Sequence, residues 1–305
     1  MPPSNTFVIV NPASGSGKTG LRWSGWEAHF RADGSEFEVG FTTEPGHAAR
    51  LAREAAQSGY KKIISVGGDG TLNEMLNGLI ENDRAVADVQ LGVLPVGTGS
   101  DFARALGIPK DPRKAWQHLM NGAAMPLDVG RIDTRRGDQT VTRYFANVAG
   151  LGFDGEVADR VNRSGRKGGG TLPYLTTMFA SLLRYQNKTV KVTIDDRTLE
   201  GRMNSVVVCN ARYFGGGMHI APHAEWDDGQ FDVIILGDLN KLEVLANTPR
   251  IYQGTHLLHR KVKFLRGRSI RVEAKELMYL QAEGELIGEA PTTFKMLPSL
   301  LKVLM

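Results

Sequence analysis

Val66–Leu79, VGGDGTLNEMLNGL, decides the fold of this chain. The residues that lead into it, Lys61–Val66 (KKIISV), are typical of a buried strand. Apolar residues then recur at helical spacing, at Leu72, Met75, Leu76 and Leu79. The GGDGT turn at 67–71 therefore joins a strand to a helix. Glycines let backbone N–H groups approach an anion closely, and a helix N-terminus adds partial positive charge, so this turn is predicted to bind phosphate groups.

Two polar side chains of this turn have predicted roles. An aspartate repels phosphate unless a cation lies between them, so Asp69 is interpreted as a residue that handles Mg²⁺ or a water network beside the phosphates. Thr71 is interpreted as a hydroxyl donor to the phosphates. The alternative is an ordinary strand-to-helix turn whose glycines only satisfy backbone geometry, and it is the weaker interpretation of GGDGT in this setting.

A second glycine-rich loop, NPASGSGKTG at 11–20, follows the predicted strand Thr6–Val10. Pro12 stands where a Walker A loop requires glycine, which excludes that motif. What remains is a loop placed to contact phosphates, with Asn11 and Ser14 as candidate donors. The alternative is a flexible capping loop.

A third turn, PVGTGSD at 95–101, follows the predicted strand Gln90–Leu94 and opens the predicted helix Phe102–Leu106. Phe37–Thr43 is interpreted as another strand and His47–Ser58 as an amphipathic helix. Alternating strands and helices predict a parallel sheet. Such sheets bind ligands at the carboxyl ends of their strands, where these turns and Thr42 lie.

After Met125 the pattern changes, because most predicted strands follow one another without helices between them. The predicted strands are Leu127–Asp133, Thr142–Val148, Thr189–Ile194, Met203–Cys209, Phe231–Leu236, Lys263–Leu265, Ile270–Glu273 and Leu277–Leu280. The predicted helices among them are Gly155–Asn162, Leu172–Tyr185 and Leu239–Tyr252. We therefore expect an α/β domain at 1–124 and a mainly antiparallel β-sandwich domain at 125–305.

GGDGTLNE at 67–74 resembles the signature of the diacylglycerol-kinase-type catalytic domain, found in bacterial lipid kinases and in sphingosine and ceramide kinases, and more distantly in NAD kinases. Other motifs that resemble the family occur in the family's order: NPASGSGKTG at 11–20, LPVGTGSDFAR at 94–104, LDVG at 127–130, DDGQFDV at 227–233 and EGE at 283–285. Together they cover nearly the whole chain. The resemblance implies a nucleotide domain followed by a β-rich lipid-binding domain, with the last strand returning to the first domain.

The turns and the resemblance together suggest an ATP site. Its candidate residues are Asn11, Ser14, Thr42, Gly67, Gly68, Asp69, Gly70, Thr71, Leu72, Asn73, Gly97, Thr98 and Glu285.

Pro222–Val233 resembles the family's structural Mg²⁺ loop, in which one carboxylate and two backbone carbonyls hold the ion. The resemblance implies that Asp228 supplies the carboxylate and that Glu225 and Gln230 supply the carbonyls. The alternative is a common Asp-Asp-Gly turn before a strand. Asp69, Asp101 and Asp128 also lie in family motifs, which implies a carboxylate and water network.

The resemblance implies that Glu283 is the catalytic base, with Asp69 as the second candidate. The family commonly has Asp-Gly-Glu here, whereas this chain has Glu283-Gly284-Glu285, so the reach of the carboxylate differs by up to about 1.5 Å, one bond length. We expect the turn to present Glu283 at an exposed strand end. A second departure is Ser100, where the family has asparagine.

The composition excludes a disordered or a fibrous protein. With 305 residues, 41% hydrophobic and 23% charged, the chain is typical of a globular protein with two domains. The single cysteine, Cys209, lies in an apolar run and is expected to be buried in a reducing compartment. Neither a signal peptide nor a transmembrane segment is predicted, so we expect a cytoplasmic protein. The sequence gives no indication of oligomeric state.

Basic residues are unevenly distributed, because residues 125–305 hold 25 Lys and Arg against 20 Asp and Glu. Two stretches, Val161–Ile194 and His259–Val272, contain no acid. The alternatives are a solvated surface, an anionic membrane surface and a nucleic acid. No aromatic-interleaved patch or nucleic-acid-binding motif is present, so membrane is favoured over nucleic acid. The residues expected at a membrane are Arg163, Arg166, Lys167, Arg266 and Arg268.

These observations predict an ATP- and Mg²⁺-dependent lipid kinase, peripheral to the inner face of a membrane, with a diacylglycerol-like or sphingoid-like lipid alcohol as acceptor. One alternative is a kinase for a soluble hydroxyl such as the ribose of NAD. Another is a nucleotide or lipid sensor that keeps the phosphate-binding turns without catalysis.

Overall fold

The computed structural model describes residues 4–97, 99–163 and 180–305. The chain divides into two compact units. The first comprises Met1–Val129 with Ser299–Met305, and the second comprises Gly130–Pro298. The boundary between the units falls inside the long strands β7 (Ala124–Arg136) and β17 (Glu285–Leu304).

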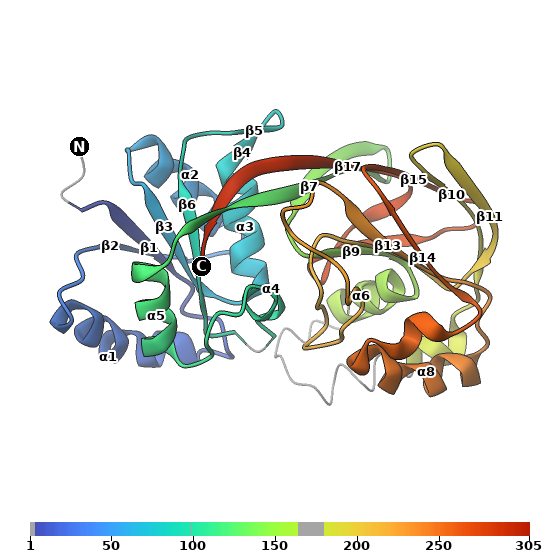
Figure 1. Ribbon diagram of the computed structural model, residues 1–305, viewed down its shortest axis with the longest axis horizontal. Helices are drawn as coiled ribbons and strands as arrows, with labels where there is room; N and C mark the ends of the chain where they lie inside the picture. The colour runs from blue at the N-terminus through green and yellow to red at the C-terminus, as the bar shows by residue number, and fades with distance from the viewer. Residues whose placement is uncertain (1–3, 98, 164–179) are drawn as a thin grey trace. The chain divides into compact units, whose positions relative to one another are not determined.

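The first unit is built on a parallel sheet in the order β2-β1-β3-β6 (Figure 1). Its strands are β1 (Thr6–Val10), β2 (Glu38–Phe41), β3 (Lys62–Gly67) and β6 (Gln90–Pro95). The end of β17 adds to this sheet, parallel to β6, with Lys302 opposite Gln90. Strands β1 and β3 are almost wholly buried, as central strands of a parallel sheet are.

The helices of this unit are α1 (Lys18–Ala32), α2 (His47–Gln57), α3 (Asp69–Leu79), α4 (Asp101–Ala105) and α5 (Pro112–Asn121), with a short hairpin of β4 (Ile80–Glu81) and β5 (Arg84–Ala85). Helix α2 packs against α3. Helix α1 packs against α5, where the rings of Phe30 and Trp116 stack with centroids 4.3 Å apart. These contacts bury the aromatic residues and fix α1 beside the sheet.

The second unit is an antiparallel β-sandwich. Its strands besides β7 and β17 are β8 (Gln139–Phe145), β9 (Val148–Gly152), β10 (Lys188–Ile194), β11 (Arg197–Met203), β12 (Ser205–Cys209), β13 (Phe231–Leu236), β14 (Val262–Gly267), β15 (Ser269–Ala274) and β16 (Tyr279–Ala282). They pair in the order β14-β13-β12-β9-β16-β17, while β10 pairs with β11 and β15. Phe145, Phe231 and Phe294 meet in the core. Helices α6 (Phe153–Arg163) and α8 (Lys241–Gln253) and the 3₁₀ helix η1 (Thr255–Leu258) complete the unit (Figure 1).

The predicted fold class is confirmed, whereas several predicted elements were wrong or missed. Helix α1 was not predicted, because its solvent-facing and buried positions show almost no apolar periodicity. The predicted strand at 203–209 breaks at Asn204, and β11 before it was missed because its residues are mostly polar and partly exposed. The predicted strand at 142–148 is divided between β8 and β9. Of the helix predicted at 172–185, residues 180–184 are helical and 172–179 lie outside the described residues.

Candidate functional site

Three glycine-rich turns of the first unit meet at the carboxyl ends of β1, β3 and β6. The backbone N–H groups of Val96 and Gly97 both donate to the Gly67 carbonyl, at 3.3 and 3.2 Å. The Asn11 N–H donates to the Val66 carbonyl at 3.0 Å. The turns that the sequence suggests separately are therefore joined through their backbones into one continuous surface.

Glycine is present at these turn positions for different structural reasons. A Cβ on Gly97 would lie 2.5 Å from the Cα of Gly68, and a Cβ on Gly67 would lie 2.6 Å from the Thr71 hydroxyl oxygen. Both glycines are therefore required by packing. Among the described residues, a Cβ on Gly68 would meet only the Gly97 Cα, at 3.6 Å, which is an ordinary contact. The space beside Gly68 is thus open to a ligand.

Helix α3 begins in this space. Its N-cap residue is Gly68, and among the described residues no side chain caps the helix. The first N–H groups of a helix have no partner within the helix and carry the positive end of the helix dipole. This helix end therefore has the geometry and the electrostatics to bind an anion.

Asp69 anchors α4 to the GGDGT turn. Its two carboxylate oxygens accept hydrogen bonds from the backbone N–H groups of Asp101, at 3.1 Å, and Phe102, at 3.2 Å. The N-cap of α4 is Ser100, which has a left-handed backbone with φ of 51° and makes no capping bond of its own. Asp69 thus takes the place of the missing cap, a role that sequence interpretation did not include.

The Thr71 hydroxyl is oriented by Asn11. The Asn11 amide nitrogen donates to the Thr71 oxygen at 2.9 Å, so the hydroxyl proton of Thr71 remains for another acceptor. The Ser14 hydroxyl lies 2.8 Å from the Asn11 carbonyl and 2.7 Å from the Thr19 hydroxyl. Ser14 therefore holds its own loop together.

The remaining candidates of the first unit differ in their surroundings. Leu72 is a core residue whose N–H donates to the Gly68 carbonyl, so neither its side chain nor its N–H faces the open space beside Gly68. Gly70 and Asn73 are half-buried in the first turns of α3. Thr42 lies at the end of β2, and its N–H donates to the Val10 carbonyl at 2.9 Å. Thr98 lies outside the described residues.

Glu283 belongs to the second unit and forms a two-residue turn between β16 and β17. Both turn residues have positive φ, 54° at Glu283 and 82° at Gly284. One carboxylate oxygen of Glu283 accepts hydrogen bonds from the N–H groups of Ala146, at 3.1 Å, and Asn147, at 2.8 Å. The turn was predicted, but the side chain is half-buried and bound, not presented at an exposed strand end. Two backbone donors therefore fix the position of this carboxylate.

Glu285 is the first residue of β17 and is exposed. It lies opposite Ala282 in the β16–β17 ladder. It therefore shares the Glu283 turn and belongs to the second unit, whereas the glycine-rich turns belong to the first.

The Asp228 loop precedes β13 in the second unit. One Asp228 oxygen accepts from the Gln230 N–H at 2.9 Å, and the other pairs with Arg266. Arg266 also contacts Asp232, with Nε 3.0 Å from the carboxylate oxygen. Arg266 is therefore engaged by two carboxylates, which argues against its predicted place at a membrane. Of the other basic residues expected there, Arg166, Lys167 and the side chain of Arg163 lie outside the described residues.

The donors of this loop suit Mg²⁺, which prefers oxygen ligands. Within residues 4–97, 99–163 and 180–305, no three His, Cys, Asp or Glu side chains gather into a metal-binding group. A site here would thus combine the Asp228 carboxylate with the carbonyl oxygens of Glu225 and Gln230. The Arg266 guanidinium already neutralises Asp228, so it would compete with the ion.

The second unit contains an apolar cavity of about 80 Å³. Strands β12, β13 and β14 supply one wall, with Val207, Leu236 and Val262, and helices α6 and α8 supply the others. The described residues that line it are Phe153, Asp154, Val157, Asn204, Ser205, Val207, Phe214, Met218, Ile220, Leu236, Leu239, Val244, Asn247, Thr248, Ile251, His256 and Val262. Most of this lining is apolar, so the cavity suits a small apolar group, such as one short part of a hydrocarbon chain.

Asp154 is the acidic residue on this lining. The Gln281 amide nitrogen donates to one carboxyl oxygen at 3.2 Å, and the other oxygen is buried and accepts no hydrogen bond from the described residues. Burial raises the pKa of the Asp154 carboxyl, although the Gln281 hydrogen bond acts in the opposite direction. A Cβ on Gly150 would overlap this carboxyl, so Gly150 makes the space for it. The sequence suggested only a helix near this residue and missed its place in the cavity.

Comparisons with known proteins identify the family. Residues 5–132 match the model of the diacylglycerol kinase catalytic domain, and residues 147–305 match the YegS C-terminal NAD kinase beta sandwich-like domain. The chain is 32% identical to the diacylglycerol kinase of Bacillus subtilis, over 94% of this chain and 91% of that protein.

Two solved structures share the fold. A putative diacylglycerol kinase from Bacillus anthracis has a TM-score of 0.79 at 24% identity, covering 98% of this chain and 94% of that one. Yeast NADH kinase complexed with NADH has a TM-score of 0.51 at 10% identity, covering 100% of this chain and 83% of that one.

The buried Asp154 carboxyl should make stability depend on pH. Because its pKa is raised in the folded state above the unfolded value of about 3.9, its stabilising contribution is complete below that value and is lost as the pH rises through the folded pKa. The free energy of unfolding of the wild type should therefore fall relative to that of Asp154→Asn as the pH rises above about 4. Urea unfolding at a series of pH values measures the difference.

Asp196→Asn, in the exposed turn between β10 and β11, is the matched control and should follow the wild-type profile. A difference between the wild type and Asp154→Asn that is constant over the whole pH range would contradict the assignment.

Proposed function

Because the chain belongs to the diacylglycerol kinase family, we propose that it is an ATP- and Mg²⁺-dependent kinase that transfers the γ-phosphoryl group of ATP to a lipid hydroxyl. The observation that carries the proposal is the meeting of three glycine-rich turns at the uncapped N-terminus of α3. A polyphosphate is the anion that such a surface of backbone N–H groups accommodates. Phosphoryl transfer depends mainly on positioning and charge stabilisation, which this surface offers.

The acceptor is proposed to be a lipid alcohol of the diacylglycerol or sphingoid kind. The apolar cavity of the second unit supports this, because its lining suits a short part of a hydrocarbon chain better than the polar ribose of NAD. The described part of the chain has no helix long and apolar enough to span a bilayer. We therefore propose that the protein reaches its substrate as a peripheral protein at the anionic, cytoplasmic face of a membrane.

Glu283 is proposed to be the general base that takes the proton from the lipid hydroxyl. Its carboxylate is held by the N–H groups of Ala146 and Asn147, so it is positioned by the backbone of the chain. Asp228 with the Glu225 and Gln230 carbonyls is proposed to hold Mg²⁺. The ion would bind these oxygen ligands and order the loop before β13.

The experiment that tests the function is incubation of the protein with γ-labelled ATP and Mg²⁺ in the presence of a total lipid extract, of NAD, or of neither. Label in a lipid product supports the proposal. Label in NADP would indicate a kinase for a soluble acceptor. Yeast NADH kinase has a fold similar to that of this chain. ATP binding without turnover on any acceptor would indicate a sensor.

ATP binding should depend on the open space beside Gly68. Gly68→Val places a branched side chain in that space while its φ of −98° remains allowed, so ATP binding should be lost in a folded protein. Isothermal titration calorimetry with Mg²⁺–ATP measures the affinity, and thermal unfolding confirms the fold. Gly25→Val, on α1 with no heavy atom near its Cβ position, is the control and should bind ATP normally. If folded Gly68→Val binds Mg²⁺–ATP with unchanged affinity, GGDGT is an ordinary turn and not a phosphate-binding one.

Glu283→Gln should lower kcat by about 10²-fold or more while ATP affinity stays unchanged. Glutamine can still accept the two backbone hydrogen bonds, so the variant removes basicity and little else. Glu283→Asp should keep partial activity, and Glu285→Gln should be milder than Glu283→Gln. Steady-state kinetics with the lipid acceptor measure these effects. A near-wild-type kcat for Glu283→Gln would assign the base to another group, with Asp69 as the next candidate.

Mg²⁺ dependence should change in opposite directions at Asp228 and Arg266. Asp228→Ala removes the charged ligand and should raise the Mg²⁺ concentration needed for half-maximal activity. Arg266→Gln removes the competing cation and should lower it. The Mg²⁺-induced shift in Tm provides a readout without turnover and should disappear in Asp228→Ala. Titrations that overlay the wild type for both variants would place the metal elsewhere.

A further inference from the structure

Helix α8 presents an apolar face to solvent. Its residues Leu242, Leu245, Ala246, Pro249 and Tyr252 follow one another at helical spacing and are all exposed, and we name them the outer stripe. Leu242 is 76% exposed and Tyr252 is 47% exposed. A surface helix normally turns polar residues to water, so this face is the reverse of the usual pattern.

The opposite face of α8 forms a wall of the apolar cavity. Val244, Asn247, Thr248 and Ile251 all line the cavity. A helix with its side chains is about 10 Å thick, so a single helix separates the cavity from the outer stripe. The cavity and the outer stripe therefore lie on opposite faces of the same helix, α8.

The charges around the stripe are basic. Lys241 and Arg250 are exposed at the two ends of α8. Glu243 is the one acid in the helix, and Lys261 Nζ lies 2.7 Å from its carboxylate. The Lys261 hydrogen bond lowers the pKa of Glu243, which keeps the pair ionised and mutually neutralised. The stripe is thus flanked by cations without a free acid on the helix.

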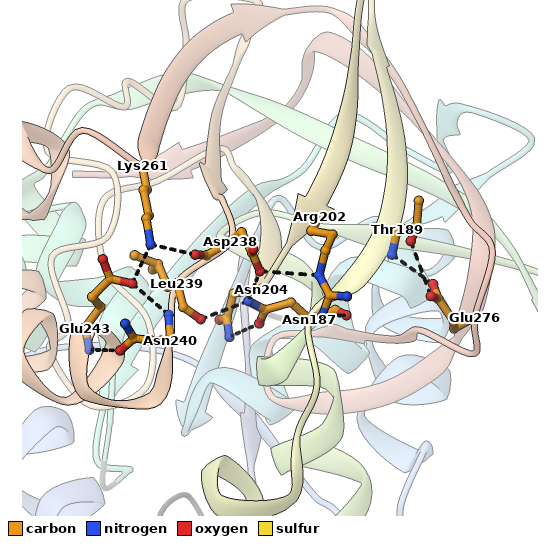
Figure 2. A network of polar contacts seen from close by, with 10 residues as sticks. All are labelled: Asn187, Thr189, Arg202, Asn204, Asp238, Leu239, Asn240, Glu243, Lys261 and Glu276. Carbon is orange, nitrogen blue, oxygen red and sulfur yellow. Dashed lines mark hydrogen bonds and ion pairs between the residues drawn. The ribbon is translucent and has the colours of Figure 1, made fainter.

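A polar network fixes the start of α8 (Figure 2). Asn240 and Glu243 form a capping box, in which each side chain accepts from the other's backbone N–H, at 2.9 and 2.8 Å. Asn187, the residue before β10, donates to the carbonyl of Leu239, which lies just before α8, at 2.8 Å, as the same figure shows. These bonds fix the residue at which α8 begins.

Other exposed leucines lie at both ends of the helix. Lys241 Nζ bonds to the carbonyl of Leu183, a residue that is 70% exposed. Leu258, in η1 just after α8, is 86% exposed. Both extend the apolar surface beyond the helix itself.

We propose that the outer stripe, with Lys241 and Arg250, docks on an anionic bilayer and brings the cavity to the membrane. The proposal rests on the lipid-kinase function and names the surface through which that function is exercised. An amphipathic helix with apolar and cationic residues lies in the bilayer interface, with its apolar side chains among the acyl chains. A second copy of the chain is a poorer partner, because pairing two stripes would bring cations together.

The test is sedimentation with vesicles of phosphatidylcholine containing phosphatidylglycerol. The double variant Leu242→Gln/Leu245→Gln should reduce the partition onto these vesicles about tenfold or more. Arg250→Gln should reduce it about fivefold, and raised salt should do the same. The matched controls Leu21→Gln and Arg22→Gln, on exposed positions of α1 in the first unit, should bind as the wild type does.

A second measurement does not depend on loss of binding. Leu242→Trp places an indole in the stripe, and its fluorescence should shift to shorter wavelength on addition of the anionic vesicles, whereas Leu21→Trp should show no shift. Phosphorylation of a short-chain, water-soluble diacylglycerol without vesicles should be unchanged in Leu242→Gln/Leu245→Gln. Failure of the wild type to phosphorylate any lipid would refute the kinase function, but the vesicle-binding results would still test the docking surface.

Three outcomes would overturn the docking surface. They are equal vesicle binding by the wild type and Leu242→Gln/Leu245→Gln, absence of a fluorescence shift for Leu242→Trp, and binding by the wild type that is the same on pure phosphatidylcholine at low and high salt. Loss of self-association in the double variant with vesicle binding retained would assign the stripe to an interface between copies and would also refute the proposal.

Discussion

The approach of the Gly68 and Gly97 backbones is the constraint on which the rest of the first unit depends. A Cβ on Gly97 would lie 2.5 Å from the Gly68 Cα, so only glycine lets the turns after β3 and β6 come this close. The approach brings Asp69 within hydrogen-bond distance of the first N–H groups of α4. Helices α3 and α4 therefore begin at the same edge of the parallel sheet, which concentrates positive potential there.

The second unit differs from the first, because it holds carboxyl groups beside an apolar interior. Glu283 receives two backbone N–H donors, whereas Asp154 is buried beside the cavity and has a raised pKa. The first arrangement fixes the position of a carboxylate, whereas burial in the second raises the pKa of the carboxyl beside the cavity. Helix α8 closes that cavity and turns an apolar face outward, so the structures that suit a lipid occur together in this unit.

Much of this fold could be predicted from local pattern, and most of the site's detail could not. The strands before the glycine turns are short apolar runs, and Glu283-Gly284 is recognisable as a turn, because turn chemistry is local. The bond between Asp69 and Asp101 of α4 joins residues 32 positions apart, and the bond between Glu283 and Ala146 joins residues 137 positions apart. No local sequence signal encodes either bond. The pairing of Arg266 with Asp228 likewise depends on the register of β13 and β14. Helix α1 was missed because burial of a few aromatic residues, not periodicity, holds it in place.

The central claim is that the joined glycine turns hold the triphosphate of ATP. A crystal structure with Mg²⁺ and a non-hydrolysable ATP analogue tests it most directly. We expect phosphate oxygens within hydrogen-bond distance of the backbone N–H groups at Gly68 and Gly70 and of the Thr71 hydroxyl. A triphosphate bound elsewhere, with these groups facing only solvent, would contradict the claim.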